Sequence, residues 1–124
     1  MPTPRELLDA NLHDVFNNRD PEARRAVIDR IYHDDIVFTD PEGTTTGRDA
    51  IDRKAGGLLE TAPAEFQFVD DSIHYDGGDT AALGWAFGPV GAPVLRGIDI
   101  LTIRDGRIGG IRTIVVEGAP DGPR

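Results

Sequence analysis

Along the first half of the chain, apolar residues recur at the three- and four-residue spacing of helices. A first helix is predicted to begin with a capping box over residues 3–6, with proline at its first position, and to end near residues 17–19. A second helix begins at residues 20–21, where an Asp-Pro pair supplies the cap, and ends around residues 33–35. A third helix follows from about residue 48 to 60.

The remaining apolar residues alternate with polar ones, which is the pattern of β-strands. One short strand is expected over 36–39, before the third helix, and residues 44–47 are expected to form a loop. Longer strands are predicted over 65–75, 80–88, 94–104 and 107–117, with residues 118–124 as a loose tail. Helices that are segregated from a run of antiparallel strands indicate an α+β fold. Such helices cover one face of a bent sheet and leave a cavity at its open end.

Composition narrows the partners of this predicted domain. The 124 residues suit a single domain spanning 1–124, and there is no cysteine for a disulfide or a thiolate. The formal net charge of −9 repels nucleic acid phosphates and anionic membranes, so we expect neither as a partner. The first residues lack the apolar run of a signal peptide, and no stretch approaches the length of a membrane span, which favours a soluble cytoplasmic protein. The three histidines, His13, His33 and His74, are scattered without metal-ligand spacing, so no metal or cofactor is expected.

Asp40 ends the short predicted strand and stands directly before a proline. Residues 40–43 (DPEG) match a type I turn, so a purely structural role can explain this acid. The alternative is a carboxylate that a stiff turn holds at the mouth of the cavity. There it can act as a general base on a substrate proton within hydrogen-bond reach.

Asp99 lies in the middle of the strand predicted over 94–104. Strand alternation places it on the apolar face, together with Leu95, Gly97, Leu101 and Ile103. Removing an ionised carboxylate from water is costly. Asp99 must therefore be paired with a cation or be protonated with a raised pKa.

Two registers of the last two strands decide between these states of Asp99. A two-residue turn at 105–106 places Asp99 opposite Arg112, as a cross-strand ion pair without a chemical role. A three-residue loop with Gly106 in a G1 bulge shifts the register by one residue. Asp99 then shares a face with Ile111, Thr113 and Val115 and has no evident cation. We favour the bulged register because it turns an apolar row toward the apolar face.

The segments around both acids resemble a known superfamily. Residues 40–43 (DPEG) and 47–51 (GRDAI) resemble the segment after the first strand in the steroid delta-isomerase and SnoaL-like branches of the nuclear-transport-factor-2-like superfamily. Residues 96–101 (RGIDIL) and 105–108 (DGRI) resemble their penultimate strand and turn. The similarity runs from about Leu7 to Val116. It implies a cone-shaped, cystatin-like fold with three N-terminal helices on a strongly curved, mostly antiparallel sheet around an internal pocket.

The resemblance to ketosteroid isomerases implies that Asp40 is the base that shuttles a proton, and that Asp99 stays protonated and donates to the developing enolate oxygen. Those enzymes carry a tyrosine donor on the first helix, where our alignment places Leu12, beside His13. In SnoaL-like polyketide cyclases, an acid such as Asp99 serves as general acid/base. The limonene-epoxide-hydrolase-like branch needs an Asp-Arg-Asp set, but Arg96 and Asp99 face opposite sides of the predicted strand.

Two functions remain open at this point. The first is acid/base catalysis, isomerase- or cyclase-like, on a small hydrophobic molecule with a carbonyl group, by Asp40 and Asp99. The second is a non-catalytic ligand-binding or dimerisation module, and the superfamily resemblance implies a homodimer in either case. The residues expected to line the pocket are Leu12, His13, Phe16, Phe38, Leu58, Phe66, Phe68, Trp85, Ile111, Thr113 and Val115.

Overall fold

The computed structural model describes residues 2–116, so the predicted tail at 118–124 lies outside the described residues. The helical elements are α1 (Pro4–Asp9), the π-helix η1 (Ala10–Phe16), α2 (Pro21–Ile31) and α3 (Arg48–Thr61). The capping box is present, since the Thr3 hydroxyl accepts from the Glu6 N–H and the Glu6 carboxylate accepts from the Thr3 N–H. None of the helices within this part of the chain combines the length and the hydropathy that crossing a bilayer requires.

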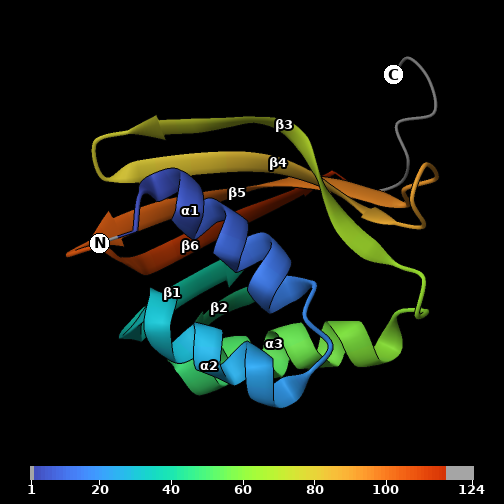
Figure 1. Cartoon of the computed structure of the whole chain (residues 1–124), viewed down its shortest axis with the longest axis horizontal. Coiled ribbons are helices and arrows are strands. Elements are labelled where there is room, and N and C mark those ends of the chain that lie inside the picture. The colour runs from blue at the N-terminus through green and yellow to red at the C-terminus, as the bar shows by residue number, and fades with distance from the viewer. Residues whose placement is uncertain (1, 117–124) are drawn as a thin grey trace.

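Six strands form one strongly bent, mostly antiparallel sheet (Figure 1). They are β1 (Tyr32–Asp40), β2 (Gly43–Thr46), β3 (Gln67–Gly77), β4 (Thr80–Gly88), β5 (Leu95–Arg104) and β6 (Arg107–Val116). Their order across the sheet is β2-β1-β6-β5-β4-β3. Strands β1 and β6 run parallel, and the other neighbouring pairs are antiparallel. This arrangement confirms the predicted α+β fold, with three helical regions on a curved sheet.

Several predicted boundaries are wrong. The strands expected over 36–39 and 65–75 are Tyr32–Asp40 and Gln67–Gly77. The second helix ends at Ile31 instead of residues 33–35, and β1 begins directly at Tyr32. Residues 44–47, expected to be a loop, mostly belong to β2, because the turn after Asp40 reverses the chain and Thr44–Thr46 pair with Val37–Thr39. Three consecutive β-branched threonines favour this extended pairing.

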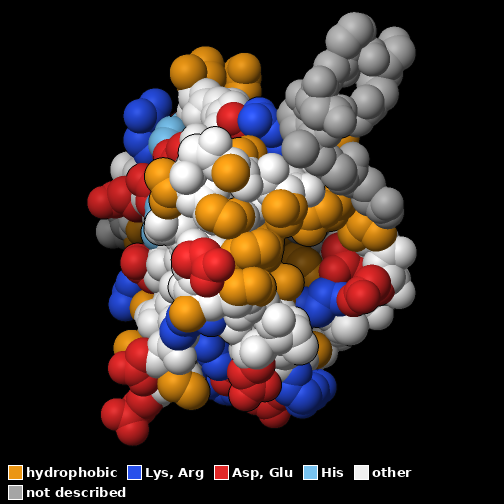
Figure 2. Space-filling model, turned by 90° about the vertical axis from the view of Figure 1, so that its right-hand side faces the viewer, with side chains coloured by type: hydrophobic (Ala, Val, Ile, Leu, Met, Phe, Trp, Pro, Cys, Tyr) orange, Lys and Arg blue, Asp and Glu red, His pale blue; other side chains and the backbone are white. Residues whose placement is uncertain are grey.

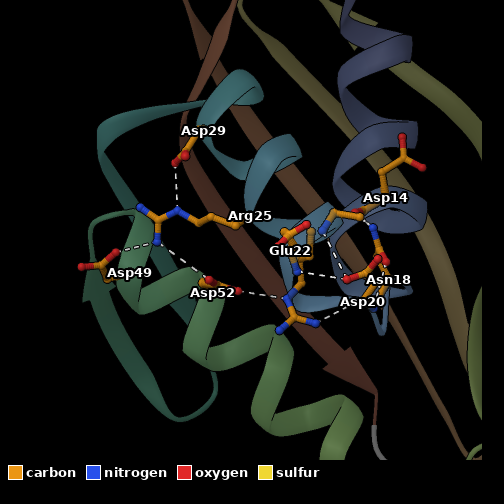
Figure 3. A network of polar contacts seen from close by, with 10 residues as sticks. Asp14, Asn18, Asp20, Glu22, Arg25, Asp29, Asp49 and Asp52 are labelled. Atoms are coloured by element: carbon orange, nitrogen blue, oxygen red, sulfur yellow. Dashed lines mark hydrogen bonds and ion pairs between the residues drawn. The ribbon is translucent and has the colours of Figure 1, made fainter.

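Helices α2 and α3 are tied together by ion pairs at one end of the molecule (Figure 3). Arg25 on α2 contacts Asp29 on its own helix at 2.9 Å and Asp49 on α3 at 2.6 Å. The buried Arg24 donates to Asp52 at 2.9 Å. The Arg24 guanidinium packs against Gly56, where a Cβ atom would lie 2.8 Å from Nη2. Of the two adjacent glycines at 56 and 57 in α3, Gly56 therefore allows one close approach between the two helices.

The combined α1–η1 segment crosses the inner face of the long strands, while α2 and α3 lie near β1 and β2 (Figure 1). The π-helix is marked by the hydrogen bond from the Asn17 N–H to the Leu12 carbonyl, five residues back, at 3.0 Å. The side chain of Asn17 also pairs with the backbone of Phe68 in both directions, at 2.8 and 2.6 Å. These contacts fix η1 over the sheet and leave a cavity beside it.

Candidate active site

A cavity of about 750 Å³ opens between η1, α3 and the inner face of the sheet. This volume suits a small-molecule ligand. Aromatic rings form much of its wall: Phe68 lies edge-on to Trp85 with ring centroids 5.1 Å apart, and Phe16 stacks on Phe38 at 6.0 Å. Figure 2 shows a hollow among hydrophobic side chains, with acidic and basic side chains at one side of it. The cavity is therefore apolar inside and charged at its edge.

The register of β5 and β6 turns Asp99 toward this cavity. Asp99 lies opposite Thr113, and Arg112 lies opposite Ile100. The turn itself has two residues, since Arg104 pairs with Arg107, and Asp105 and Gly106 have φ values of 53° and 74°. The prediction of a G1 bulge at Gly106 is therefore wrong.

The predicted facing of Asp99 is nonetheless correct, because the register slips elsewhere. Thr102 lies opposite Gly110 and Ile103 lies opposite Ile108, which leaves Gly109 as the extra residue of a bulge within β6. One inserted residue turns every following side chain of the strand to the opposite face of the sheet. Arg112 is consequently exposed on the outer face and forms no ion pair with Asp99 in the described part of the chain.

The Asp99 carboxyl group is 7% exposed and accepts three hydrogen bonds. Trp85 Nε1 donates to Oδ1 at 3.0 Å, and Thr113 Oγ1 donates to the same oxygen at 2.8 Å. Asn11 Nδ2 donates to Oδ2 at 3.0 Å. Because a carboxylate oxygen has two lone pairs, Oδ1 is saturated and Oδ2 has room for one further partner.

Burial and hydrogen bonding act on Asp99 in opposite directions. Burial raises the pKa of the Asp99 carboxyl above its ordinary value, while the hydrogen bonds from Thr113, Trp85 and Asn11 lower it. Burial is the stronger effect, so the pKa of Asp99 is raised. A buried carboxyl with a raised pKa in an apolar cavity is typical of groups that exchange protons with a substrate.

Asn11 is a site residue that the sequence-based prediction missed. It is 1% exposed, and its Oδ1 accepts a hydrogen bond from the hydroxyl of Tyr32, which is completely buried. The resemblance placed Leu12 at the donor position of the first helix, but the preceding residue, Asn11 in η1, is the one that donates to Asp99. A signal was available, since Asn11 is a polar residue on the apolar stripe that begins with Leu7 and Leu8.

Gly97 makes the contact between Trp85 and Asp99 possible. The indole of Trp85 lies over this glycine, so that a Cβ atom at residue 97 would be 2.5 Å from its Cζ2 atom. On the neighbouring strand, the carbonyl oxygen of Ile114 would be equally close. A side chain of any size at residue 97 would displace the ring that donates to Asp99.

Asp40 lies at the edge of the same cavity, with its side chain 12% exposed. Its Oδ1 accepts from the Glu42 N–H at 2.9 Å, as the first residue of the predicted turn, and its Oδ2 contacts Lys54 Nζ at 2.8 Å. Lys54 also contacts the Glu42 carboxylate. Burial alone would lower the pKa of Lys54, but these two carboxylates outweigh it and raise the pKa, so this lysine stays an ammonium group.

Both acids meet at the same segment of β6. Thr39 pairs with Arg112, so the next residues of the two parallel strands, Asp40 and Thr113, are neighbours. Thr113 is in turn directly opposite Asp99. The sheet thus places the two carboxyl groups on either side of one residue, facing one cavity.

A model of the SnoaL-like domain family matches residues 10–110 of the sequence. The chain belongs to this family. A search of the curated proteins gives no match. The family match runs from the start of η1 to Gly110 in β6, so it includes Asp40 and Asp99 but ends before the lining residues Thr113 and Val115.

Solved structures of other proteins share the fold of this SnoaL-like domain. A candidate isomerase of the SnoaL-like family from Agrobacterium tumefaciens superimposes with a TM-score of 0.81 at 20% identity, over 89% of this chain and 94% of that one. A candidate ketosteroid isomerase from Kribbella flavida gives 0.70 at 20% identity, over 98% and 83%. A candidate polyketide cyclase from Sinorhizobium meliloti gives 0.66 at 22% identity, over 91% and 94%. At these identities the likeness establishes the fold alone.

Most residues that the sequence indicated for the pocket line the cavity of this SnoaL-like domain. Three do not: His13 contacts Asp70 at 2.7 Å on the outside, and Phe66 and Ile111 pack outside the lining. The indicated residues that line the cavity are Leu12, Phe16, Phe38, Asp40, Leu58, Phe68, Trp85, Asp99, Thr113 and Val115, and further lining comes from Pro41, Glu42, Arg53, Lys54, Gly57, Thr61, Phe87 and Leu95.

A separate polar cluster ties α1 and η1 to β3. His74 contacts Asp9 at 2.6 Å and Asp70 at 3.8 Å, and Asp70 also contacts His13. Asp9, Asp70 and His74 are close enough to share a metal ion, which the scattered histidines of the sequence did not indicate. The hydrogen bonds of His74 to Asp9 and of His13 to Asp70 account for this proximity, so the cluster has an evident structural role.

Proposed function

We propose that this SnoaL-like domain binds a small, largely apolar molecule with a carbonyl group and catalyses proton transfer on it, as an isomerase or a cyclase does. One observation carries the proposal: two carboxyl groups, Asp99 and Asp40, face a single apolar cavity from opposite sides of Thr113. The family membership and the fold of isomerase- and cyclase-like relatives agree with it.

The chemistry follows from the carboxyl groups and the apolar walls. One carboxylate takes a proton from the carbon beside the carbonyl group, and the electrons of that C–H bond remain on the substrate as an enolate. Return of the proton at another carbon completes an isomerisation. Attack of the enolate carbon on a second carbonyl closes a ring, and the carboxyl group then returns its proton to the alkoxide oxygen that forms. Aromatic walls that exclude water strengthen the electrostatic interactions that stabilise the enolate.

Hydrogen–deuterium exchange tests the proposal without knowledge of the natural substrate. 2-Tetralone, an apolar ketone with an acidic C–H bond, is incubated with the protein in D₂O, and the loss of the C–H signal is followed by NMR. We expect exchange well above the buffer rate, reduced at least tenfold in Asp99→Asn and in Asp40→Asn. The control is Asp105→Asn in the exposed β5–β6 turn, which should exchange at the parental rate.

The outcomes separate the two candidate functions. Exchange at the buffer rate, together with saturable binding of 2-tetralone, would favour a non-catalytic ligand-binding module. If 2-tetralone underwent no exchange and did not bind, a role for the cavity would be refuted. Equal exchange by the parent and both cavity variants would refute catalysis by these two acids.

We also propose that the protein is a cytoplasmic homodimer that pairs through the outer face of the sheet. Ile114 and Val116 are 48% and 56% exposed there, next to Ile98, which lies opposite Ile114. Exposed apolar residues gathered on one face favour a protein contact. Sedimentation of the parent and of Ile114→Glu tests this: we expect a dimer that the added charge converts to a monomer, and a monomeric parent would contradict it.

A further inference from the structure

We propose that Tyr32 and Asn11 form a positioning pair that holds Asp99 in its ionised form, so that the cavity prefers ligands that present a hydrogen-bond donor, such as a hydroxyl or enol group, to Asp99 Oδ2. The inference rests on the proposed ligand-binding cavity and names the ligand chemistry at its buried end. It gives Asp99 the role of proton acceptor, whereas the resemblance to ketosteroid isomerases implies a proton donor.

Three polar side chains of the described residues surround the Asp99 carboxyl group, and each can donate to it. The indole N–H of Trp85 can only donate, the Thr113 hydroxyl can rotate to donate, and the Asn11 amide donates when its NH₂ group faces Asp99. Hydrogen bonds to a charged acceptor are stronger than those to a neutral one. Three donors therefore stabilise the carboxylate and offset part of the rise in the pKa of Asp99 that burial causes.

Tyr32 decides which way the Asn11 amide is oriented. The Tyr32 hydroxyl donates to Asn11 Oδ1, which leaves the amide NH₂ group to face Asp99. In the reverse orientation Asn11 Oδ1 would accept a hydrogen bond from the O–H of a neutral Asp99, and Asn11 Nδ2 would donate to the Tyr32 oxygen. The Tyr32 O–H is completely buried and has no other acceptor within residues 2–116, so that orientation would leave it unsatisfied.

Tyr32 can fill this role because it keeps its proton. Burial, and then the charge of Asp99, raise the pKa of the Tyr32 hydroxyl well above its ordinary value of 10. The hydroxyl is therefore always a donor at physiological pH. The chain Tyr32 → Asn11 → Asp99 runs in one direction, from a group that does not ionise to one that does.

No other charged group contacts Asp99 in the described part of the chain. The neighbours from η1, β4 and β6 are Asn11, Trp85 and Thr113, and Tyr32 from β1 acts through Asn11. The remaining charges of the cavity are at its edge, on Asp40, Glu42, Arg53 and Lys54. Lys54 forms ion pairs with Asp40 and Glu42. Changes at Tyr32 should therefore reach Asp99 without a competing direct ion pair.

The titration of Asp99 in the ligand-free protein tests the positioning pair. Trp85 is the only tryptophan and donates to Asp99, so its fluorescence should follow the ionisation, and carboxyl ¹³C NMR identifies the group. In Tyr32→Phe we expect the pKa of Asp99 to rise by about 0.5 to 1 unit, because one hydrogen bond to a charged group loses its support. In Asn11→Leu the rise should be at least as large.

The other tyrosine supplies the matched control. Tyr75 is 54% exposed, and Tyr75→Phe should leave the titration of Asp99 unchanged. In the Asn11→Leu background, Tyr32→Phe should cause no further shift, because Tyr32 acts through Asn11. A parental titration in Tyr32→Phe, or an equal shift in the presence and absence of Asn11, would overturn the positioning pair.

A pair of ligands tests the preference for a donor. 2-Naphthol and 2-methoxynaphthalene share one ring system, but only the first has an O–H group. We expect 2-naphthol to bind at least about tenfold more tightly by calorimetry, as one hydrogen bond to a carboxylate implies, with the difference reduced in Tyr32→Phe. Equal affinities would refute the preference, and absence of binding by both would instead count against the cavity as a ligand site. The pH titration of Asp99 uses the ligand-free protein, so it tests the positioning pair whatever the outcome of these binding measurements.

Discussion

Gly97→Ala is the substitution whose effect the structure specifies most closely. The new Cβ atom would lie 2.5 Å from Trp85 Cζ2, 2.8 Å from Cη2 and 2.5 Å from the carbonyl oxygen of Ile114. Ordinary carbon–carbon contacts are about 3.5–4.0 Å, so ring and strand must separate by about 1 Å. The indole gives way more easily than the carbonyl oxygen, which belongs to a paired strand, so the ring is displaced and the contact with the oxygen strains the β5–β6 pairing as well.

Two effects then lower the stability of the Gly97→Ala variant, and their free energies add. Overpacking in a filled core costs about 1–3 kcal/mol. Displacing the indole breaks its hydrogen bond to Asp99, which is worth about 1.5–3 kcal/mol when the acceptor is charged. The free energy of unfolding should fall by about 2.5–6 kcal/mol, and the pKa of Asp99 should rise further because it loses one donor.

Urea unfolding followed by circular dichroism measures the first effect, and the pH dependence of tryptophan emission measures the second. Gly77→Ala is the control, because Gly77 is also a strand glycine but a methyl group there would have no neighbouring atom within 4 Å. The control should be neutral or slightly stabilised. If Gly97→Ala were as stable as the control and kept the parental fluorescence titration, the packing of Trp85 on Gly97 could not be what holds the indole against Asp99.

Three further substitutions test other contacts. Gly56→Ala should destabilise the protein relative to Gly57→Ala, because only the methyl group at residue 56 meets the buried guanidinium of Arg24. Gly57→Ala should stabilise the protein by about 0.5–1 kcal/mol. Equal shifts in the melting temperature of the two variants would contradict this. Burial raises the pKa of Asp99 in the folded state, so the free energy of unfolding should decline as pH rises above 3.8, the ordinary pKa of an aspartate. Asp99→Asn should remove this pH-dependent part of the free energy, as measured by urea unfolding across that pH range. Lys54→Gln should cost no more than about 1 kcal/mol at the partly exposed cavity edge but slow the deuterium exchange of 2-tetralone, and an unchanged exchange rate would exclude a role for this ion pair.

The elements with strong local signals could be predicted from the sequence. The caps at Thr3 and Asp20 begin helices as expected, and strands β4 and β5 lie within one residue of their predicted bounds. Hydrophobic periodicity and capping are local properties, so one sequence suffices to find them. The strand β2 was missed because three threonines alone resemble a loop until the strand that pairs with them is known.

The candidate site shows where such reasoning ends. Strand alternation placed Asp99 on the apolar face correctly, but the register was derived from the wrong bulge, since Gly109 and not Gly106 carries the extra residue. The donors to Asp99 come from residues 11, 85 and 113, and such long-range contacts leave no mark in local periodicity. The π-helix is a further omission, and Asn11, which lies in it, meets Asp99 although the resemblance had pointed to Leu12.

The position of β6 in the sheet bears on how the protein is made. It is the last of the six strands to leave the ribosome, yet it lies between β1 and β5 near the centre of the sheet (Figure 1). Before it emerges, the nascent chain can form only a β2-β1 hairpin and a β5-β4-β3 meander, each with an open edge. Asp40 belongs to one of these halves and Asp99 to the other. Assembly of the two acids around one cavity therefore waits until β6 has been synthesised. A chain that stopped short of residue 107 would expose the unpaired edges of β1 and β5 instead of forming the cavity.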